Sequence, residues 1–284
     1  MHALPFVFAL AAAVLLAPAL LRALSESGHV KLNYRDRLLP CPFGVLALAA
    51  GLLALIPLAL LQRLGSGHVF EPQALPISVY AFGVLALGLV DDTLAREQPR
   101  EPGGPPAHRG WRGHGAAALR GELSTGVLKA AGSLGLALFA MSYLRLSNGR
   151  WLLAAAVLVL ATNMFNLLDL RPGRSAKAFA LLAAGLTIGS TDVRPLWTLG
   201  LFVGPAIVAG IYDVRERTML GDTGASLLGA LAGLWLVLTL SGIGQLIALG
   251  LLAAFTLYGE LRSISALVER IPLLRELDSW GRPS

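Results

Sequence analysis

Residues 150–169 read RWLLAAAVLVLATNMFNLLD, and this stretch decides the fold. Residues 151–168 carry no charge, and a run of roughly 20 mostly apolar residues is long enough for a helix to cross a bilayer. The run ends in polar groups, because Asn163, Asn166 and Asp169 recur every three residues and so share one side of a helix. The pattern predicts a transmembrane helix with a polar membrane edge, although the two amides alone equally suit helix–helix contacts.

The rest of the chain has the same apolar character. Of its 284 residues, 55% are hydrophobic and only 14% are charged, and the mean hydropathy is +0.68. Soluble domains are about a quarter charged, so an ordinary soluble domain is excluded. The single cysteine excludes a disulfide scaffold and a multi-cysteine metal site. In so apolar a chain, the basic residues behind the net charge of +6 are expected to fix the orientation in the membrane, and no nucleic-acid partner is expected.

We expect an all-α fold, a bundle of about nine transmembrane helices formed by residues 1–260. The expected spans are 3–24, 41–64, 75–91, 124–145, 150–168, 176–190, 196–212, 223–240 and 243–259. Alternate connections then hold 19 of the 23 basic residues, which predicts that this side is cytoplasmic and that the N-terminus is outside. The cytoplasmic loops would be 25–40, 91–123, 169–176 and 213–222, in a protein of the bacterial cytoplasmic membrane.

Residues 261–284 form a different kind of segment. Apolar side chains recur there at helical spacing between charged ones. The pattern predicts an amphipathic cytoplasmic helix that either lies on the membrane interface or docks on the bundle. The apolar positions are Leu261, Ile264, Leu267, Val268, Ile271, Leu274 and Leu277.

Four carboxylates lie at the ends of apolar runs on the expected cytoplasmic side. Asp91 and Asp92 close the third span, Asp169 closes the fifth, and Asp222 opens the eighth. Charged groups at such depths are costly and usually functional. Adjacent Asp91 and Asp92 repel each other unless a cation or hydrogen bonds stabilise them, and Mg²⁺ suits carboxylate ligands combined with substrate phosphates. Two solvated capping carboxylates are the alternative.

The same side offers groups that suit phosphate. Residues 221–226 place small side chains and free backbone N–H groups at a helix start, which favours anions, although Asp and Thr are also common helix caps. Lys129 lies just inside the fourth span, where it either contacts phosphate or extends harmlessly to the interface. We interpret Asp213 and Glu216, which lie among arginines, as solvated loop charges.

The order of these motifs resembles the polyprenyl-phosphate N-acetylhexosamine-1-phosphate transferase superfamily, the MraY- and WecA-type enzymes. The likeness extends from about Asn33 to Gly233, and its motifs are specific only jointly. The matching residues are Asn33-Tyr34-Arg35 with Pro40 and Gly44, Gly88–Asp92, Lys129, Asn163-x-x-Asn166-x-x-Asp169, and Met219–Ser226 with Ala225 inserted before Ser226.

The resemblance implies Mg²⁺-dependent transfer of a sugar 1-phosphate from a nucleotide sugar, a UDP-sugar in particular, to polyprenyl phosphate. The polyprenyl-diphosphate sugar would serve cell-wall synthesis, and a homodimer in membrane lipid is expected. The implied catalytic and Mg²⁺-binding residues are Asp91, Asp92 and Asp222. The implied substrate-binding residues are Lys129, Asn163, Asn166 and Asp169, with Arg171 and Arg174 as additional phosphate contacts.

The chain also departs from this pattern. Leu170-Arg171-Pro172 stands where the family continues with Gly-Leu-Asp-Gly, so Pro172 takes the place of the second aspartate. A late histidine-rich loop and a tenth helix are not evident, although His108 and His114 are candidate replacements. These departures favour an alternative, a non-catalytic descendant that binds the lipid carrier as a membrane scaffold. A transporter is disfavoured because its carboxylates would approach the membrane midplane.

Overall fold

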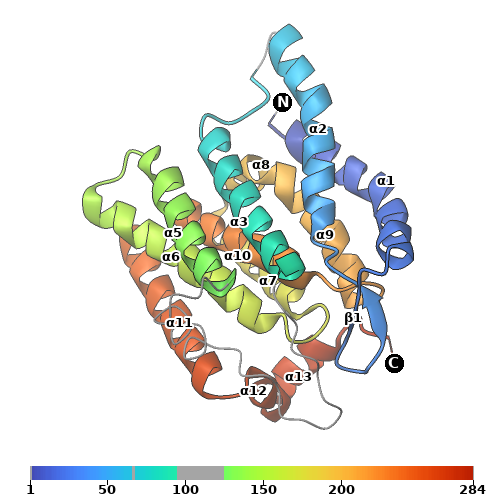
Figure 1. Cartoon of the computed structure of the whole chain (residues 1–284). Helices are drawn as coiled ribbons and strands as arrows, with labels where there is room; N and C mark the ends of the chain where they lie inside the picture. The colour runs from blue at the N-terminus through green and yellow to red at the C-terminus, as the bar shows by residue number, and fades with distance from the viewer. Residues whose placement is uncertain (1, 66–67, 95–124, 284) are drawn as a thin grey trace.

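The computed structural model describes residues 2–65, 68–94 and 125–283. These residues are helical apart from one two-stranded hairpin, which confirms the predicted all-α fold in its main part (Figure 1). The elements are α1 (Leu4–Glu26), β1 (Val30–Leu32), β2 (Leu38–Pro40), α2 (Val45–Leu64), α3 (Ala74–Leu94), α5 (Thr125–Ser142), α6 (Asn148–Leu168), α7 (Arg174–Ser190), α8 (Arg194–Thr198), α9 (Gly200–Val214), α10 (Gly221–Thr239), α11 (Gly242–Leu261), α12 (Ile264–Arg270) and α13 (Pro272–Ser279).

Among the described residues, seven helices are long and apolar enough to cross a membrane, which makes the chain an integral membrane protein with seven candidate spans in this part. They are α1, α2, α3, α5, α6, α10 and α11. The prediction of nine spans is therefore confirmed for seven of them. Predicted span 176–190 corresponds to α7, which has 17 residues, and predicted span 196–212 is divided between α8 and the 15-residue α9.

Helix α10 lies at the centre of the bundle, where α3, α6 and α7 pack around it (Figure 1). In its most apolar window 83% of the residues are buried, against 17–44% in the other six candidate spans. The outer helices expose apolar side chains such as Leu15, Leu152 and Ile188, as expected of surfaces that face lipid. Because α10 is surrounded, a side chain at its start lies among several helix ends.

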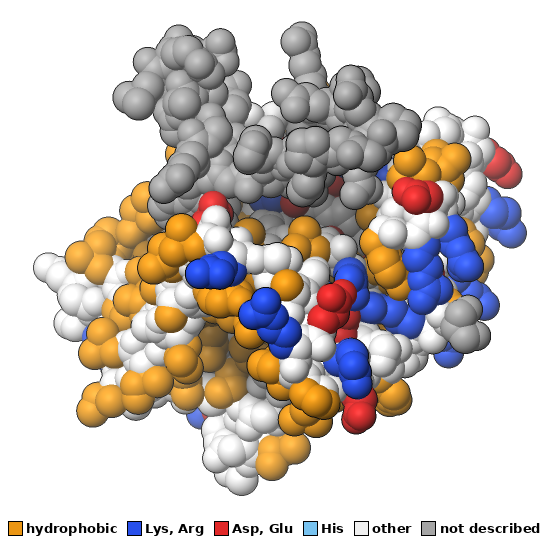
Figure 2. Space-filling view, turned by 90° about the horizontal axis from the view of Figure 1, so that it is seen from below, with side chains coloured by type: hydrophobic (Ala, Val, Ile, Leu, Met, Phe, Trp, Pro, Cys, Tyr) orange, Lys and Arg blue, Asp and Glu red, His pale blue; other side chains and the backbone are white. Residues whose placement is uncertain are grey.

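The connections between helices fall into two groups at opposite ends of the bundle. At one end the hairpin joins the segment before α10, because Phe43 N–H donates to Met219 O over 2.8 Å and Met219 N–H donates to Pro40 O over 2.9 Å. At the other end His2 contacts Glu71 over 2.9 Å. We call the end that carries the hairpin the site end; Lys and Arg side chains gather on it beside apolar ones (Figure 2).

The hairpin was not predicted. Val30 pairs with Pro40 and Leu32 with Leu38 in an antiparallel register. The turn is stabilised by Asn33, whose side-chain oxygen accepts the N–H groups of Arg35 and Arg37 over 2.8 and 3.0 Å. The motif Asn33-Tyr34-Arg35 therefore closes a turn here.

The segment 261–284 forms two short helices, α12 and α13, where one amphipathic helix was predicted. The segment contacts the bundle, since Asp278 on α13 pairs with Arg174 at the start of α7. Leu273 and Leu277 remain exposed on α13.

Candidate functional site

The two adjacent aspartates at the end of α3 point to different partners. Asp92 accepts hydrogen bonds from the N–H groups of Asp222 and Thr223 over 3.1 and 2.8 Å, and from the Thr223 hydroxyl over 2.6 Å. Its side chain is only 2% exposed. A carboxylate at this place satisfies the free N–H groups of α10 and is stabilised by the helix dipole. Asp92 therefore fixes the end of α3 to the start of α10.

Asp91 turns instead toward a lysine that it shares with Asp222. The Lys129 ammonium on α5 lies 3.4 Å from Asp91 Oδ2 and 3.1 Å from Asp222 Oδ1. The side chains of Lys129 and Asp91 are 13% and 15% exposed, whereas that of Asp222 is 43% exposed. Two carboxylates and one ammonium group from three helices thus meet at one point, which is open on the Asp222 side.

The polar side of α6 faces the same helix start. The Ser226 hydroxyl donates to Asn166 Oδ1 over 3.1 Å, which joins α6 to α10. Asn163 Nδ2 is buried and has no hydrogen-bond partner among the described residues. Asn166 therefore contacts α10, whereas the side-chain N–H groups of Asn163 have no acceptor among the described residues.

Asp169 follows α6 immediately, outside the membrane-spanning segment. Burial raises the pKa of its carboxyl well above the usual range, and the carboxylates of Asp213, Asp222 and Asp92 raise it further. These interactions place Asp169 in the same electrostatic environment as the other site aspartates. A cation brought into this environment would relieve the repulsion.

The raised pKa of Asp169 predicts a stability gain on neutralisation. An acid with a raised pKa favours folding while it is protonated, and that contribution is lost as pH rises above the ordinary carboxyl range. In metal-free buffer at neutral pH, Asp169→Asn should therefore unfold at a temperature higher by about 3 °C or more, and the gain should vanish near pH 4. Thermal unfolding in detergent against pH measures this. Asp36→Asn, on the exposed hairpin turn, is the control, and an Asp169→Asn gain that does not vary with pH would contradict the assignment.

One residue of the site was missed in the sequence. Lys31 on β1 lies 3.7 Å from Asp92 Oδ1, with its side chain 30% exposed. Strand β1 precedes the motif that starts at Asn33, and only the hairpin's contacts with the residues before α10 bring it to the aspartates. The position of Lys31 two residues before Asn33 was the available signal, and it is weak.

In the structure Arg171 and Arg174 each pair with a carboxylate of the chain itself. Arg171 pairs with Glu269, and Arg174 makes two hydrogen bonds to Asp278 over 2.9 and 3.1 Å. Arg174 is only 6% exposed. The guanidinium groups therefore connect the loop after α6 to the C-terminal helices.

The interpretation of Asp213 and Glu216 as solvated loop charges is wrong. Asp213 is 2% exposed and accepts the N–H groups of Gly173 and Leu220 over 2.6 and 3.3 Å. Glu216 is 6% exposed and accepts the Tyr34 hydroxyl over 3.1 Å. Both carboxylates hold site-end connections together, because each satisfies donors that come from elsewhere in the chain.

His108 and His114, with most of the predicted loop 91–123, lie outside the described residues.

The predicted Mg²⁺ site offers few protein ligands. Within the described ranges, no three His, Cys, Asp or Glu side chains lie close enough together to hold a metal ion. Asp91 and Asp222 offer two carboxylates, and Mg²⁺ commonly takes only one or two from the protein together with water and substrate phosphate. An Mg²⁺ ion held by these two carboxylates would therefore need further ligands from water and a phosphorylated substrate.

No protein-family model matches this chain, and no curated protein matches its sequence. A function for this chain therefore has to be proposed from the geometry and chemistry of the site.

Proposed function

We propose that the chain transfers a sugar 1-phosphate from a nucleotide sugar, a UDP-sugar in particular, to polyprenyl phosphate. The observation that carries this proposal is that the Asp91 and Asp222 carboxylates and the Lys129 ammonium meet at one point at the end of a membrane bundle. A charged headgroup on a lipid anchor reaches such an end from within the bilayer, and a nucleotide sugar reaches it from water. The distribution of basic residues supports a cytoplasmic orientation for this end.

The reaction needs alignment and charge neutralisation more than proton transfer. An oxygen of polyprenyl phosphate attacks the phosphorus of the sugar 1-phosphate group, one P–O bond forms, and the P–O bond to the nucleoside monophosphate breaks. The attacking oxygen is already ionised, so no base has to remove a proton from it. Positioned cations supply most of the catalytic effect in such transfers.

The side chains divide this work. Asp91 and Asp222 would hold Mg²⁺ together with phosphate oxygens, and the ion would neutralise charge on the diphosphate. Lys129 approaches from the bundle and neutralises phosphate beside the two carboxylates. Asp92 sets the start of α10 so that Asp222 faces this position. Asn166 and Asp169 lie on the α6 side, where they orient the nucleotide sugar.

Lys31 approaches the aspartates from the hairpin, and we assign it to the water-soluble donor. Lys31→Met should raise the KM for the nucleotide sugar about tenfold, because one charge-assisted contact to phosphate is lost, and should leave the KM for polyprenyl phosphate unchanged. Steady-state kinetics with each substrate varied in turn measures this. Arg22→Met removes an exposed cation from α1 and should change neither constant. An equal rise in both constants for Lys31→Met would remove Lys31 from the donor site.

The direct test uses purified protein, short-chain polyprenyl phosphate and a panel of nucleotide sugars. The proposal predicts release of a nucleoside monophosphate only when both the lipid phosphate and Mg²⁺ are present.

A non-catalytic lipid-carrier binder is the second candidate, and two structural observations favour it. Among the described residues no three His, Cys, Asp or Glu side chains lie close enough together to hold a metal ion, and Arg171 and Arg174 are held by carboxylates of the chain itself. Binding of polyprenyl phosphate without turnover of any nucleotide sugar would select this function.

A further inference from the structure

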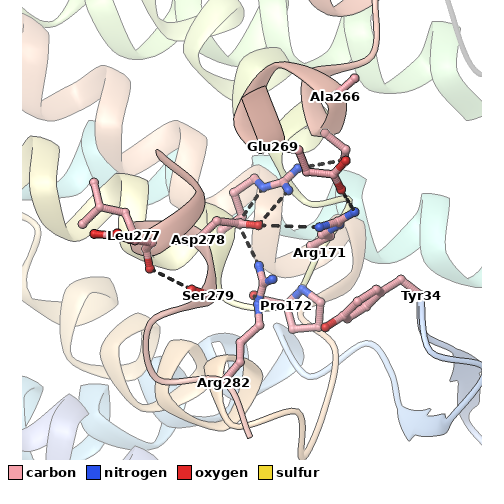
Figure 3. A network of polar contacts seen from close by, with 12 residues as sticks. Tyr34, Arg171, Pro172, Ala266, Glu269, Leu277, Asp278, Ser279 and Arg282 are labelled. Carbon is pink, nitrogen blue, oxygen red and sulfur yellow. Dashed lines mark hydrogen bonds and ion pairs between the residues drawn. The ribbon is translucent and has the colours of Figure 1, made fainter. Parts of the chain in front are cut away.

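The C-terminal segment is held against the bundle by a buried carboxylate (Figure 3). Asp278 is 8% exposed and accepts hydrogen bonds from Arg174 over 2.9 and 3.1 Å and from Arg282 over 2.8 Å. Burial alone would raise the pKa of Asp278, but the two guanidinium groups outweigh it and hold that pKa below its usual value. The carboxylate is therefore charged at neutral pH.

Backbone contacts extend the docking along the segment. The Lys177 ammonium donates to the carbonyl oxygens of Leu277, Asp278 and Trp280 over 3.0, 2.6 and 2.8 Å. These carbonyls belong to the last turn of α13 and the residues that follow, where a cation satisfies free acceptors. The start of α7 thus binds the end of α13 through two cations, Arg174 and Lys177.

The same segment reaches the loop that follows Asp169. Arg282 Nε donates to Pro172 O over 2.9 Å, and Arg171 pairs with Glu269 on α12. Residues 170–173 are consequently held from the C-terminal side, while Asp213 holds Gly173 from the other. The loop that carries Asp169 therefore rests on the docked segment.

Tyr34 connects this arrangement to the hairpin. The guanidinium groups of Arg35, Arg171 and Arg282 lie 5.3, 5.4 and 5.8 Å from the centre of its ring. Arg35 also donates to Pro283 O over 3.1 Å. Cations over an aromatic face are attracted to it, so the ring joins the hairpin, the loop and the C-terminal segment.

We infer that Asp278 is a positioning residue, which fixes the loop after α6 through Arg174 and Arg282 and so holds Asp169 at the site. The loop's link to substrate binding rests on the proposed function, whereas its docking does not. Removing one partner of a buried pair leaves the other charges unpaired, so the Asp278 carboxylate is the point at which the docking is most easily lost.

The test is hydrogen–deuterium exchange of the full-length protein in detergent micelles, with Asp278→Asn, Arg282→Gln and Glu276→Gln. Asp278→Asn should speed exchange across residues 169–177 by at least about tenfold, because a buried ion pair is broken. Arg282→Gln should give a smaller increase, since the Arg174–Asp278 pair remains, and it carries the test if Asp278→Asn does not fold. Glu276→Gln alters an exposed carboxylate of the same helix and should have no effect.

Kinetics on the same proteins separates positioning from general destabilisation. Asp278→Asn should raise the KM for the nucleotide sugar with kcat within about twofold of wild type, and Asp278→Glu should restore both values. Unchanged exchange in both Asp278→Asn and Arg282→Gln would overturn the inference. If the wild-type protein turns over no nucleotide sugar, the proposed function fails, but the exchange result still decides whether Asp278 holds the loop.

Discussion

Asp222→Asn should lower the turnover of nucleotide sugar by at least about a hundredfold while the protein still folds. Asp222 is the most exposed of the three converging side chains, so it is the one that meets substrate and Mg²⁺ first. The amide keeps the shape of the side chain and loses the charge that a cation needs, and losses of this size follow removal of one electrostatic group from such a site. Release of nucleoside monophosphate and thermal unfolding measure the two effects.

The matched control for Asp222→Asn is Asp192→Asn. Asp192 makes its ion pair with Arg194 at the other end of the bundle, so the same chemical change there should leave turnover unaltered. Near-normal turnover in Asp222→Asn would remove Asp222 from the catalytic group and, with it, the assigned Mg²⁺ position.

Gly88→Ala should strongly damage both the stability and the site, although it adds only one methyl group. A Cβ at Gly88 would lie 2.6 Å from Asp222 O and 2.7 Å from Thr223 Cα, which are backbone atoms that cannot rotate away. Relieving this contact moves α3 away from α10, at a cost of about 1–3 kcal/mol in the free energy of unfolding. It also moves Asp91 and Asp92 relative to Asp222, and a displacement of about 1 Å can cost roughly a hundredfold in rate.

The turnover and the thermal unfolding temperature of Gly88→Ala should therefore both fall. Gly135→Ala on α5 is the control, because a Cβ there meets no atom within 4 Å. Wild-type stability and turnover in Gly88→Ala would show that the close approach of α3 and α10 does not set the site.

Helix lengths and the position of the aspartates are the features that the sequence predicts best. Long uncharged runs decide spans such as α6 by length alone, and the polar residues at their ends have to lie at a membrane edge. The predicted spans at α7 and α9 became shorter helices, because short, Gly-containing runs do not distinguish a full span from a shorter helix.

The direction of individual side chains required the structure. Asp91 and Asp92 are adjacent in the sequence, yet one shares a lysine with Asp222 and the other binds the start of α10. Lys31 comes to the site on a hairpin that is placed by contacts with Met219 and Leu220, which lie far away along the chain. Arg215 and Arg217 beside it in the sequence made Glu216 look solvated, whereas its carboxylate is buried and lies near Arg35 and Arg37 of the hairpin turn.

The most direct measurement follows phosphorus from donor to lipid. Purified protein is incubated with polyprenyl phosphate, Mg²⁺ and a UDP-sugar labelled with ³²P in the phosphate attached to the sugar, and the organic phase is then counted. The account predicts that label enters the lipid in the wild-type protein, that EDTA prevents the transfer, and that Asp222→Asn reduces it to background. Label that stays in the aqueous phase across a panel of nucleotide sugars, in a folded protein that binds polyprenyl phosphate, would contradict it.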